Sequence, residues 1–125
     1  MLGEGKVMST KMNFFDDLSD AMDDWVETVS SSITDPSADL VWVRNEAAFK
    51  NIQNVLMNKG LSEDVDNVLR ECIQGLAHSF LCILDGATKM SEKGRVYLVD
   101  NRGSKLGEGL HEEFQEFLCD KGKID

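Results

Sequence analysis

Features that would place a protein in the secreted or membrane class are missing from this sequence. No apolar run approaches the roughly 20 residues that a helix needs to cross a bilayer. Residues 1–12 lack the apolar core of a signal peptide, so we expect neither a signal peptide nor a membrane anchor. The three cysteines, Cys72, Cys82 and Cys119, are widely spaced and odd in number, unlike a secreted disulfide framework. We therefore expect a protein of the reducing cytoplasm that does not act at a membrane.

Basic residues are scarce as well. The chain has 13 Lys and Arg against 23 Asp and Glu, which gives a formal net charge of −10. Such a surface repels phosphate backbones and anionic lipid, so we expect no nucleic-acid partner. It attracts a cationic partner and speeds the encounter with one. The composition thus predicts that any macromolecular partner is a basic protein.

The motifs that mark common active sites are missing too. There is no CxxC, no HExxH and no nucleotide fingerprint, and the acidic stretch 16–24 lacks the central glycine of a calcium loop. The glycine pair Gly107 and Gly109 leads into an acidic helix start, which repels a phosphate. We therefore predict no catalytic, cofactor-binding or metal-binding residues.

The 125 residues, of which 42% are hydrophobic, are enough for one ordinary core. Residues 1–11 are polar and contain glycine, and we expect them to be flexible. The remainder, residues 12–125, is predicted to form a single globular domain.

The first helix is predicted over residues 13–31, with Asn13 as its N-cap and the serine run 30–32 as its end. Apolar residues recur there at spacings of three and four, which places them on one helix face. We expect Trp25 in the core because it belongs to this stripe. The stripe comprises Phe15, Leu18, Met22, Trp25, Val26 and Val29.

A second helix is predicted over residues 36–59. Asp35 and Pro36 resemble an N-cap followed by proline at the first helical position, and Gly60 ends the pattern. Residues 40–43 form a β-branched and aromatic run, so a short strand is an alternative there.

The third helix is predicted over residues 62–85, with Ser62 as its cap and an acidic first turn that suits the helix dipole. Its second half, residues 76–84, is apolar on nearly every side. Such a helix is normally buried centrally or buried in an oligomer contact.

A β-hairpin is predicted over residues 95–106, with a turn at 100–103, and a last helix over about 108–120. The expected fold is therefore α+β and predominantly α-helical: four helices around the long central helix 62–85, with the small hairpin before the last helix. An all-α bundle is the alternative.

The acidic side of the first helix is the most informative surface feature. No Lys or Arg occurs between Lys11 and Arg44, and the helix dipole does not explain the carboxylates beyond the first turn. One interpretation is an ordinary solvated face; the other is a docking surface for a basic partner, with Trp42 as an anchor. The candidate partner-binding residues are Asp16, Asp20, Asp23, Asp24, Glu27 and Trp42.

Three hypotheses about function remain open. The first is a non-enzymatic binding protein that neutralises a basic partner, in concrete form a bacterial immunity protein or antitoxin-like inhibitor. The second is a small enzyme or metal-binding protein that uses His78, Cys82 and His111, of which His78 and Cys82 are four apart on one helix. The third is a structural homodimer built on the apolar half of the third helix and the surface around Trp42.

Overall fold

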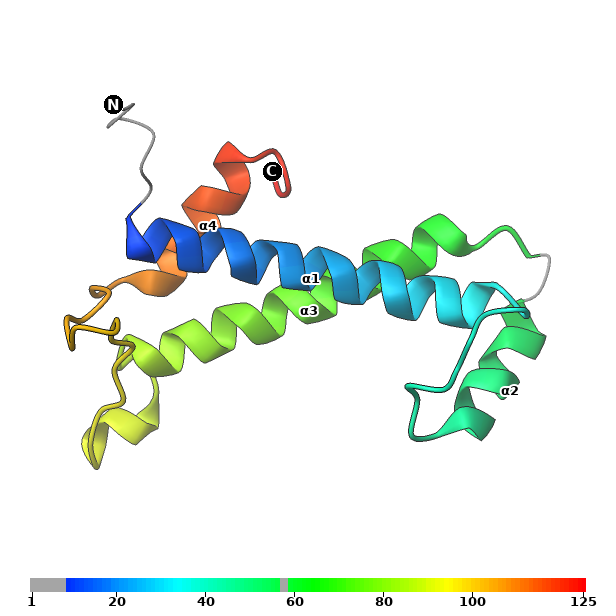
Figure 1. Cartoon of the computed structure of the whole chain (residues 1–125), viewed down its shortest axis with the longest axis horizontal. Helices are drawn as coiled ribbons and strands as arrows, with labels where there is room; N and C mark the ends of the chain where they lie inside the picture. Colours follow the sequence, from blue (N-terminus) through cyan, green and yellow to red (C-terminus); the bar gives the residue numbers. More distant parts are fainter. Residues whose placement is uncertain (1–8, 57–58) are drawn as a thin grey trace. The chain divides into compact units, whose positions relative to one another are not determined.

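The computed structural model describes residues 9–56 and 59–125 and is mostly helical (Figure 1). The described residues contain four α-helices, one short 3-10 helix and no strand, so the all-α alternative fits and the α+β prediction does not. None of the described helices is both long and apolar enough to cross a membrane. Residues 1–8 of the predicted flexible segment lie outside the described residues.

Contacts between residues divide the described part of the chain into two compact units. The middle unit comprises residues 21–74, and the terminal unit combines residues 9–20 with residues 75–125. Helix α1 (Thr10–Thr34) and helix α3 (Ser62–Leu84) each contribute residues to both units. A single domain over residues 12–125 stays a prediction.

Helix α1 begins earlier than the predicted residue 13. The Ser9 hydroxyl accepts a hydrogen bond from the Met12 N–H (3.2 Å), and the Ser9 carbonyl accepts one from the Asn13 N–H (2.9 Å). Ser9 therefore caps the helix, and the prediction that Asn13 does so is wrong.

Helix α1 also continues through the serine run 30–32 that was expected to end it. The hydroxyl of Ser32 donates to the carbonyl of Thr28 (2.6 Å), and that of Thr34 donates to the carbonyl of Ser30 (2.8 Å). These bonds turn the hydroxyls back onto the helix, so the run is compatible with helix and does not stop it.

Helix α2 spans Glu46–Leu56, which makes it much shorter than the predicted 36–59. Asn45 caps it, since the Asn45 side-chain oxygen accepts a hydrogen bond from the Ala48 N–H (3.1 Å). Residues 57–58, near the predicted end, lie outside the described residues.

The segment 36–45 before α2 is held by local side-chain bonds. Asp35 accepts a hydrogen bond from the Ser37 N–H (2.9 Å), and Asp39 accepts one from the Val41 N–H (2.9 Å). The Ser37 hydroxyl and N–H together hold the pKa of Asp35 below its usual range. Such bonds compete with the helix, so the prediction of a helix starting at residue 36 is wrong.

The middle unit contains one buried polar side chain that joins two of its segments. Gln53 is 3% exposed, and its amide nitrogen donates to the Ser32 carbonyl (2.5 Å) and to the Asp35 carbonyl (3.4 Å). The bond ties α2 to the end of α1 and satisfies the amide. The buried Leu40 opens a turn, because its carbonyl accepts a bond from the Val43 N–H (3.0 Å), so the alternative of a strand at 40–43 is also wrong.

Helix α3 ends one residue before the predicted 85, and its start at Ser62 is as predicted. The Leu61 carbonyl accepts the first helical bond, from the Val65 N–H (2.9 Å), so Leu61 occupies the cap position and Ser62 is the first helical residue. In its second half, Leu76 is 73% exposed and Phe80 is 50% exposed. This face is therefore not buried within the chain, and its burial in an oligomer contact stays a prediction. The buried side chains are Ala77, Leu81 and Leu84.

The core of the terminal unit is aromatic. Phe15 from α1 lies 5.2 Å from Phe114 and 5.9 Å from Phe117, measured between ring centroids, and all three side chains are buried. Both partners come from α4 (Leu110–Asp120), which begins two residues after the predicted start. The 3-10 helix η2 (Lys89–Glu92) lies in the loop between α3 and α4.

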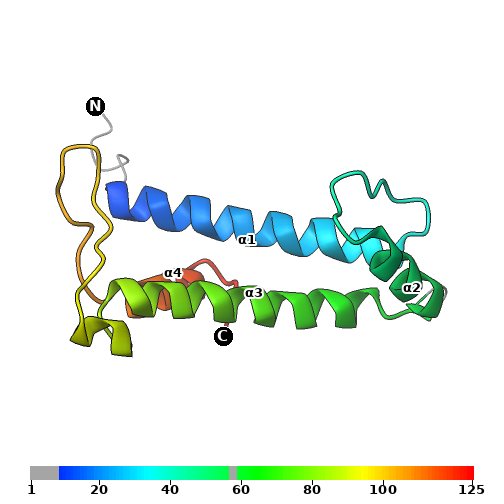
Figure 2. The same ribbon diagram turned by 90° about the horizontal axis from the view of Figure 1, so that it is seen from below.

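The predicted hairpin over 95–106 is wrong, although its turn is in the right place. Figure 2 shows this part of the terminal unit as two extended arms joined by a tight turn. An isolated antiparallel bridge joins Val99 to Lys105, and it is flanked by bonds from the Asp100 N–H to the Ser104 carbonyl (2.8 Å) and from the Leu106 N–H to the Leu98 carbonyl (2.9 Å). Two short arms are not stable as a sheet unless other elements cover them. The side chains to be covered remain exposed: Val96 by 44%, Tyr97 by 38% and Val99 by 50%.

Candidate partner-binding surface

The acidic residues predicted as a docking surface on α1 have different surroundings. They are divided between the units, with Asp16 and Asp20 in the terminal unit and Asp23, Asp24 and Glu27 in the middle unit. Asp16 and Asp20 are clustered, and the other three, of which Asp23 is also ion-paired, line pockets of the middle unit. Each surrounding gives its carboxylates a different capacity to bind a partner.

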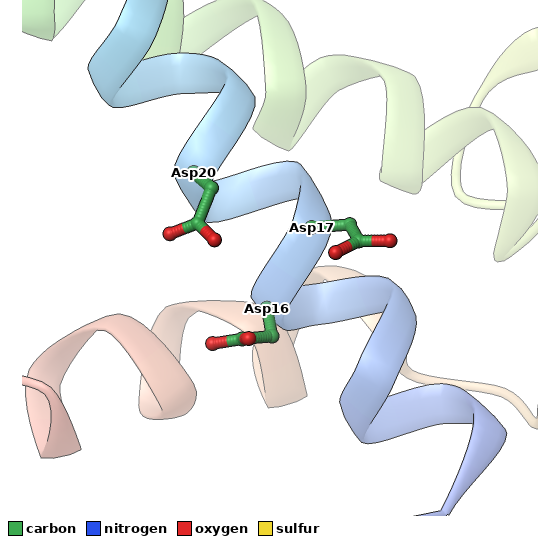
Figure 3. Close-up of side chains that lie close together, drawn as sticks. All are labelled: Asp16, Asp17 and Asp20. Carbon is green, nitrogen blue, oxygen red and sulfur yellow. The ribbon is translucent and has the colours of Figure 1, made fainter.

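In the terminal unit, Asp16, Asp17 and Asp20 lie near one another on neighbouring turns of α1 (Figure 3). One carboxylate oxygen from each of the three lies within 4.8 Å of the others, and Asp17 and Asp20 are exposed. Three carboxylates at this spacing are able to attract a cation, but exposed acidic groups are also common without one. We assign the cluster only a strongly negative surface potential.

In the middle unit, Asp23 is paired with a base from another helix. Arg70 on α3 donates to the Asp23 carboxylate at 2.8 Å, and the two side chains are 37% and 38% exposed. This pair offsets part of the charge that looked unopposed in the sequence. Asp23 is therefore a weaker candidate for contact with a partner than Asp24 or Glu27.

Asp24 and Trp42 meet at a shallow pocket of about 340 Å³ in the middle unit. Trp25 forms the other aromatic wall, with its ring centroid 5.8 Å from that of Trp42 and the ring planes 66° apart. Trp25 is 53% exposed, so its predicted place in the core is wrong, and Trp42 is 40% exposed. The pocket is lined by Ala21, Asp24, Trp25, Thr28 and Trp42.

A second pocket of the middle unit, about 430 Å³ in volume, opens between α1 and α3. Its lining is polar, and its three carboxylates outnumber the single base, Arg70. An anion is disfavoured there, whereas a cationic or hydroxyl-bearing group meets several acceptors. The lining residues are Asp23, Val26, Glu27, Ser30, Ser31, Thr34, Asp66 and Arg70.

The histidines of the alternative metal or enzyme hypothesis do converge in the terminal unit. The ring centroids of His78 and His111 are 5.3 Å apart, and the planes are nearly perpendicular. Among the described residues, the only group of three or more His, Cys, Asp or Glu side chains close enough to share a metal is the one around Asp17, so Cys82 does not join the two histidines. The pair therefore lacks a third ligand within the described residues.

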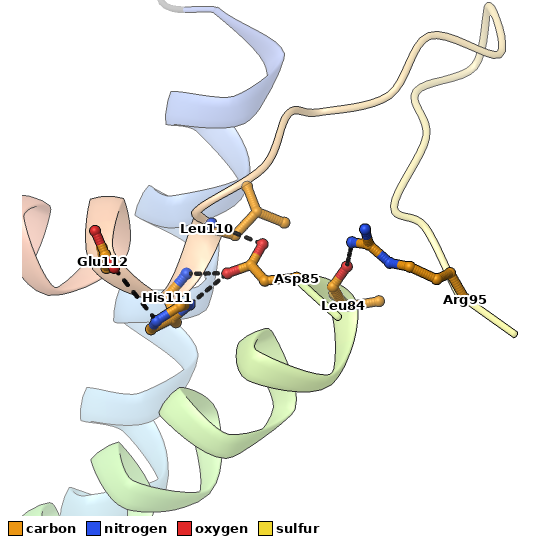
Figure 4. Close-up of polar contacts among 6 residues, drawn as sticks. All are labelled: Leu84, Asp85, Arg95, Leu110, His111 and Glu112. Atoms are coloured by element: carbon orange, nitrogen blue, oxygen red, sulfur yellow. Dashed lines mark hydrogen bonds and ion pairs between the residues drawn. The ribbon is translucent and has the colours of Figure 1, made fainter. Parts of the chain in front are cut away.

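His111 is engaged by Asp85, which lies directly after α3 (Figure 4). Asp85 is 4% exposed in its side chain; it accepts hydrogen bonds at 2.8 Å from the N–H groups of Leu110 and His111 and contacts the His111 ring through Nδ1. Burial raises the pKa of the Asp85 carboxyl, but these bonds outweigh it, so its pKa lies below the usual value. Asp85 thereby accepts hydrogen bonds from the first two N–H groups of α4, which have no acceptor within the helix and receive no side-chain cap from Gly109.

Three residues of these sites were missed or misplaced from the sequence. Arg70 bonds to Asp23 over 47 positions of sequence, and Asp85 accepts a bond from Leu110 over 25 positions. No local sequence pattern marks such pairs. Trp25 lies at the edge of the apolar stripe, and that position was the available signal of its exposure.

Comparison of the chain with protein-family models, with curated proteins and with solved structures finds no match.

Proposed function

We propose that this chain is a non-enzymatic binding protein that engages a basic protein through the middle-unit part of α1. The observation that carries the proposal is the pair of exposed tryptophans, Trp25 and Trp42, beside the carboxylate of Asp24. Tryptophan is the residue type most enriched in binding hot spots, and it is rarely left this exposed without a function.

Charge supports the same kind of partner. The chain has a net charge of −10, and the second pocket adds Glu27 from α1 and Asp66 from α3. Opposite charges on two surfaces raise the association rate and disfavour acidic competitors. A basic partner therefore meets carboxylates at both pockets, together with an aromatic anchor.

The concrete form that we favour is a small inhibitor of the immunity-protein or antitoxin kind. Its support is the small size of the chain, its acidity and the prediction of no catalytic residues. Such an inhibitor is expected to suppress the activity of the basic protein that it retains.

The test is retention of proteins from a lysate of the source cells on immobilised chain at low and high salt. We expect a basic protein to be retained at low salt and released at high salt, because ionic contacts are screened. The double variant D24N/E27Q is expected to retain much less of it. If no basic protein is retained at low salt, the proposal fails.

A matched control separates the surface from the overall charge. The double variant E71Q/E116Q removes the same two charges from exposed positions on α3 and α4. It is expected to retain the partner nearly as well as the wild type. Equal loss in both variants would contradict a specific surface on α1.

Self-association is a second candidate, and one observation favours it. Leu76 and Phe80 are strongly exposed on α3 within residues 72–84, a stretch that contains no Asp, Glu, Lys or Arg. Two copies that repel each other elsewhere are able to meet at such an uncharged face. Light scattering tests this candidate: a dimer that L76E converts to a monomer supports it, and a monomeric wild type overturns it.

A further inference from the structure

We propose that the pocket between Trp25 and Trp42 receives the guanidinium group of an arginine from the partner. This inference rests on the proposed function and names the chemistry of its anchor. The pocket holds three kinds of surface that an arginine side chain matches: aromatic rings, a carboxylate and a hydroxyl, the last from Thr28.

The aromatic wall is already formed before any partner arrives. Trp42 is held between Trp25 and Phe49. The ring centroids of Trp42 and Phe49 are 5.6 Å apart, and the two ring planes meet at 83°. A side chain braced in this way loses little conformational freedom on binding. The rings of Trp25 and Trp42 meet at 66° and form a corner, which offers an indole surface to a planar group.

The remaining lining residues place an acceptor beside these rings. Ala21, Trp25 and Thr28 follow the i, i+4, i+7 spacing of one helix face, and Asp24 is one turn before Thr28. The small side chain of Ala21 leaves space next to the indole of Trp25. A guanidinium that stacks on the indole is able to donate to the Asp24 carboxylate with its edge.

The two indole rings are available to a cation, because no cation of the described residues lies over them. The cation–π contacts of the described residues involve Tyr97 and Phe117, both in the terminal unit. Arg70 of the middle unit donates to Asp23. Arginine is favoured over lysine because its planar group stacks and forms paired hydrogen bonds, whereas an ammonium is compact and strongly hydrated.

The two tryptophans are the only ones in the chain, so intrinsic fluorescence reports directly on the pocket. The experiment titrates the full chain with acetylated and amidated hexa-arginine, and separately with hexa-lysine of the same design. We expect a saturable change in tryptophan emission with hexa-arginine and binding several-fold weaker with hexa-lysine. An equal response to both peptides would overturn the guanidinium assignment.

Two variants test whether hexa-arginine binds at the pocket between Trp25 and Trp42. D24N is expected to weaken hexa-arginine binding about tenfold or more, as when a hydrogen bond to a charged group is lost. The control E71Q, which removes one exposed charge from α3, is expected to change it less than twofold. Circular dichroism checks that both variants keep the helical content of the wild type. Equal weakening in the two variants would overturn the proposal.

Two further outcomes separate this inference from the proposed function. If calorimetry shows salt-sensitive hexa-arginine binding while tryptophan emission and D24N affinity stay unchanged, the peptide binds elsewhere; the pocket assignment fails and the basic-partner proposal stands. A similar emission change with N-acetyl-leucine amide would show that the pocket takes an apolar side chain, which also overturns the assignment.

Discussion

The terminal and middle units place their aromatic residues in opposite ways. In the terminal unit, Phe15, Phe114 and Phe117 are 1–4% exposed and pack on one another. In the middle unit, Trp25 and Trp42 also contact each other, yet they are 53% and 40% exposed. One aromatic cluster thus stabilises a core, whereas the other is displayed at the surface.

Polar contacts follow the same division. In the terminal unit, Asp85 bonds the start of α4, and Lys123 donates to the buried Ser19 at 2.7 Å, so charged groups fasten one segment to another. In the middle unit, the two side chains of the bond from Arg70 to Asp23 are more than a third exposed, and Asp24 and Glu27 line open pockets. We infer that the terminal unit serves mainly for stability and that the middle unit supplies the binding surface.

The largest expected effect is on the aromatic core of the terminal unit. Phe114→Ala removes the ring that contacts both Phe15 and Phe117, and it should lower the free energy of unfolding by about 3–5 kcal/mol. Urea unfolding followed by circular dichroism measures this change. The matched variant in the middle unit, Trp25→Ala, should cost clearly less, because Trp25 is 53% exposed and its pair with Trp42 adds only about 0.5–1.5 kcal/mol beyond the area that it buries. Equal losses would contradict the division between the units.

The next largest effect concerns Asp85. Asp85→Asn replaces two charged oxygens by one neutral one, so that one of the N–H groups of Leu110 and His111 loses its acceptor, and the change should cost about 2–3 kcal/mol at neutral pH. The folded pKa of Asp85 lies below the unfolded value of about 3.9, so its contribution is present above that value. It is lost as the pH falls through the folded pKa.

Unfolding experiments on wild type and Asp85→Asn between pH 7 and pH 3 measure this dependence. The difference in unfolding free energy between the two proteins should shrink toward the acid end. A difference that stays constant over this range would show that the carboxylate charge does not stabilise the terminal unit.

A smaller effect is expected where α3 ends. Gly86 has a φ of +73°, and a Cβ added there would lie 2.6 Å from the Arg95 side chain. Gly86→Ala should therefore cost about 1–2 kcal/mol, the usual price of a left-handed conformation. Gly75→Ala is the control: Gly75 is inside α3 with nothing within 4 Å of an added Cβ, and the change should stabilise by about 0.5–1 kcal/mol. Thermal unfolding distinguishes the opposite signs.

The long helices were predictable from the sequence because their apolar periodicity is sustained, although the end signals held for α3 and failed for α1. α3 differs from its prediction by one residue, and Phe15 was recognised as an apolar-face residue of the first helix. The helix prediction for residues 36–45 failed because nearby backbone N–H groups donate to the side chains of Asp35 and Asp39 and not to helical carbonyls. A proline after an acidic residue fits both a helix start and a turn.

The candidate site was predictable only in part. Asp24 and Trp42 were chosen from charge and residue type, and the structure places both at one pocket, although contact with a partner stays a prediction. Trp25 was assigned to the core, since periodicity alone does not tell the centre of a stripe from its edge. The bond from Arg70 to Asp23 joins two helices across 47 positions, a distance at which local pattern carries no information.

The smallest expected effect is on that ion pair in the middle unit. Because Asp23 and Arg70 are more than a third exposed, water screens their attraction, and a double-mutant cycle with D23N and R70Q should give a coupling of about 0.2–1 kcal/mol. The coupling should fall further in high salt. Urea unfolding of the four proteins at two salt concentrations measures it. A coupling well above this range would mean that the middle unit also depends on charged contacts for its stability, and the contrast with Asp85 in the terminal unit would then disappear.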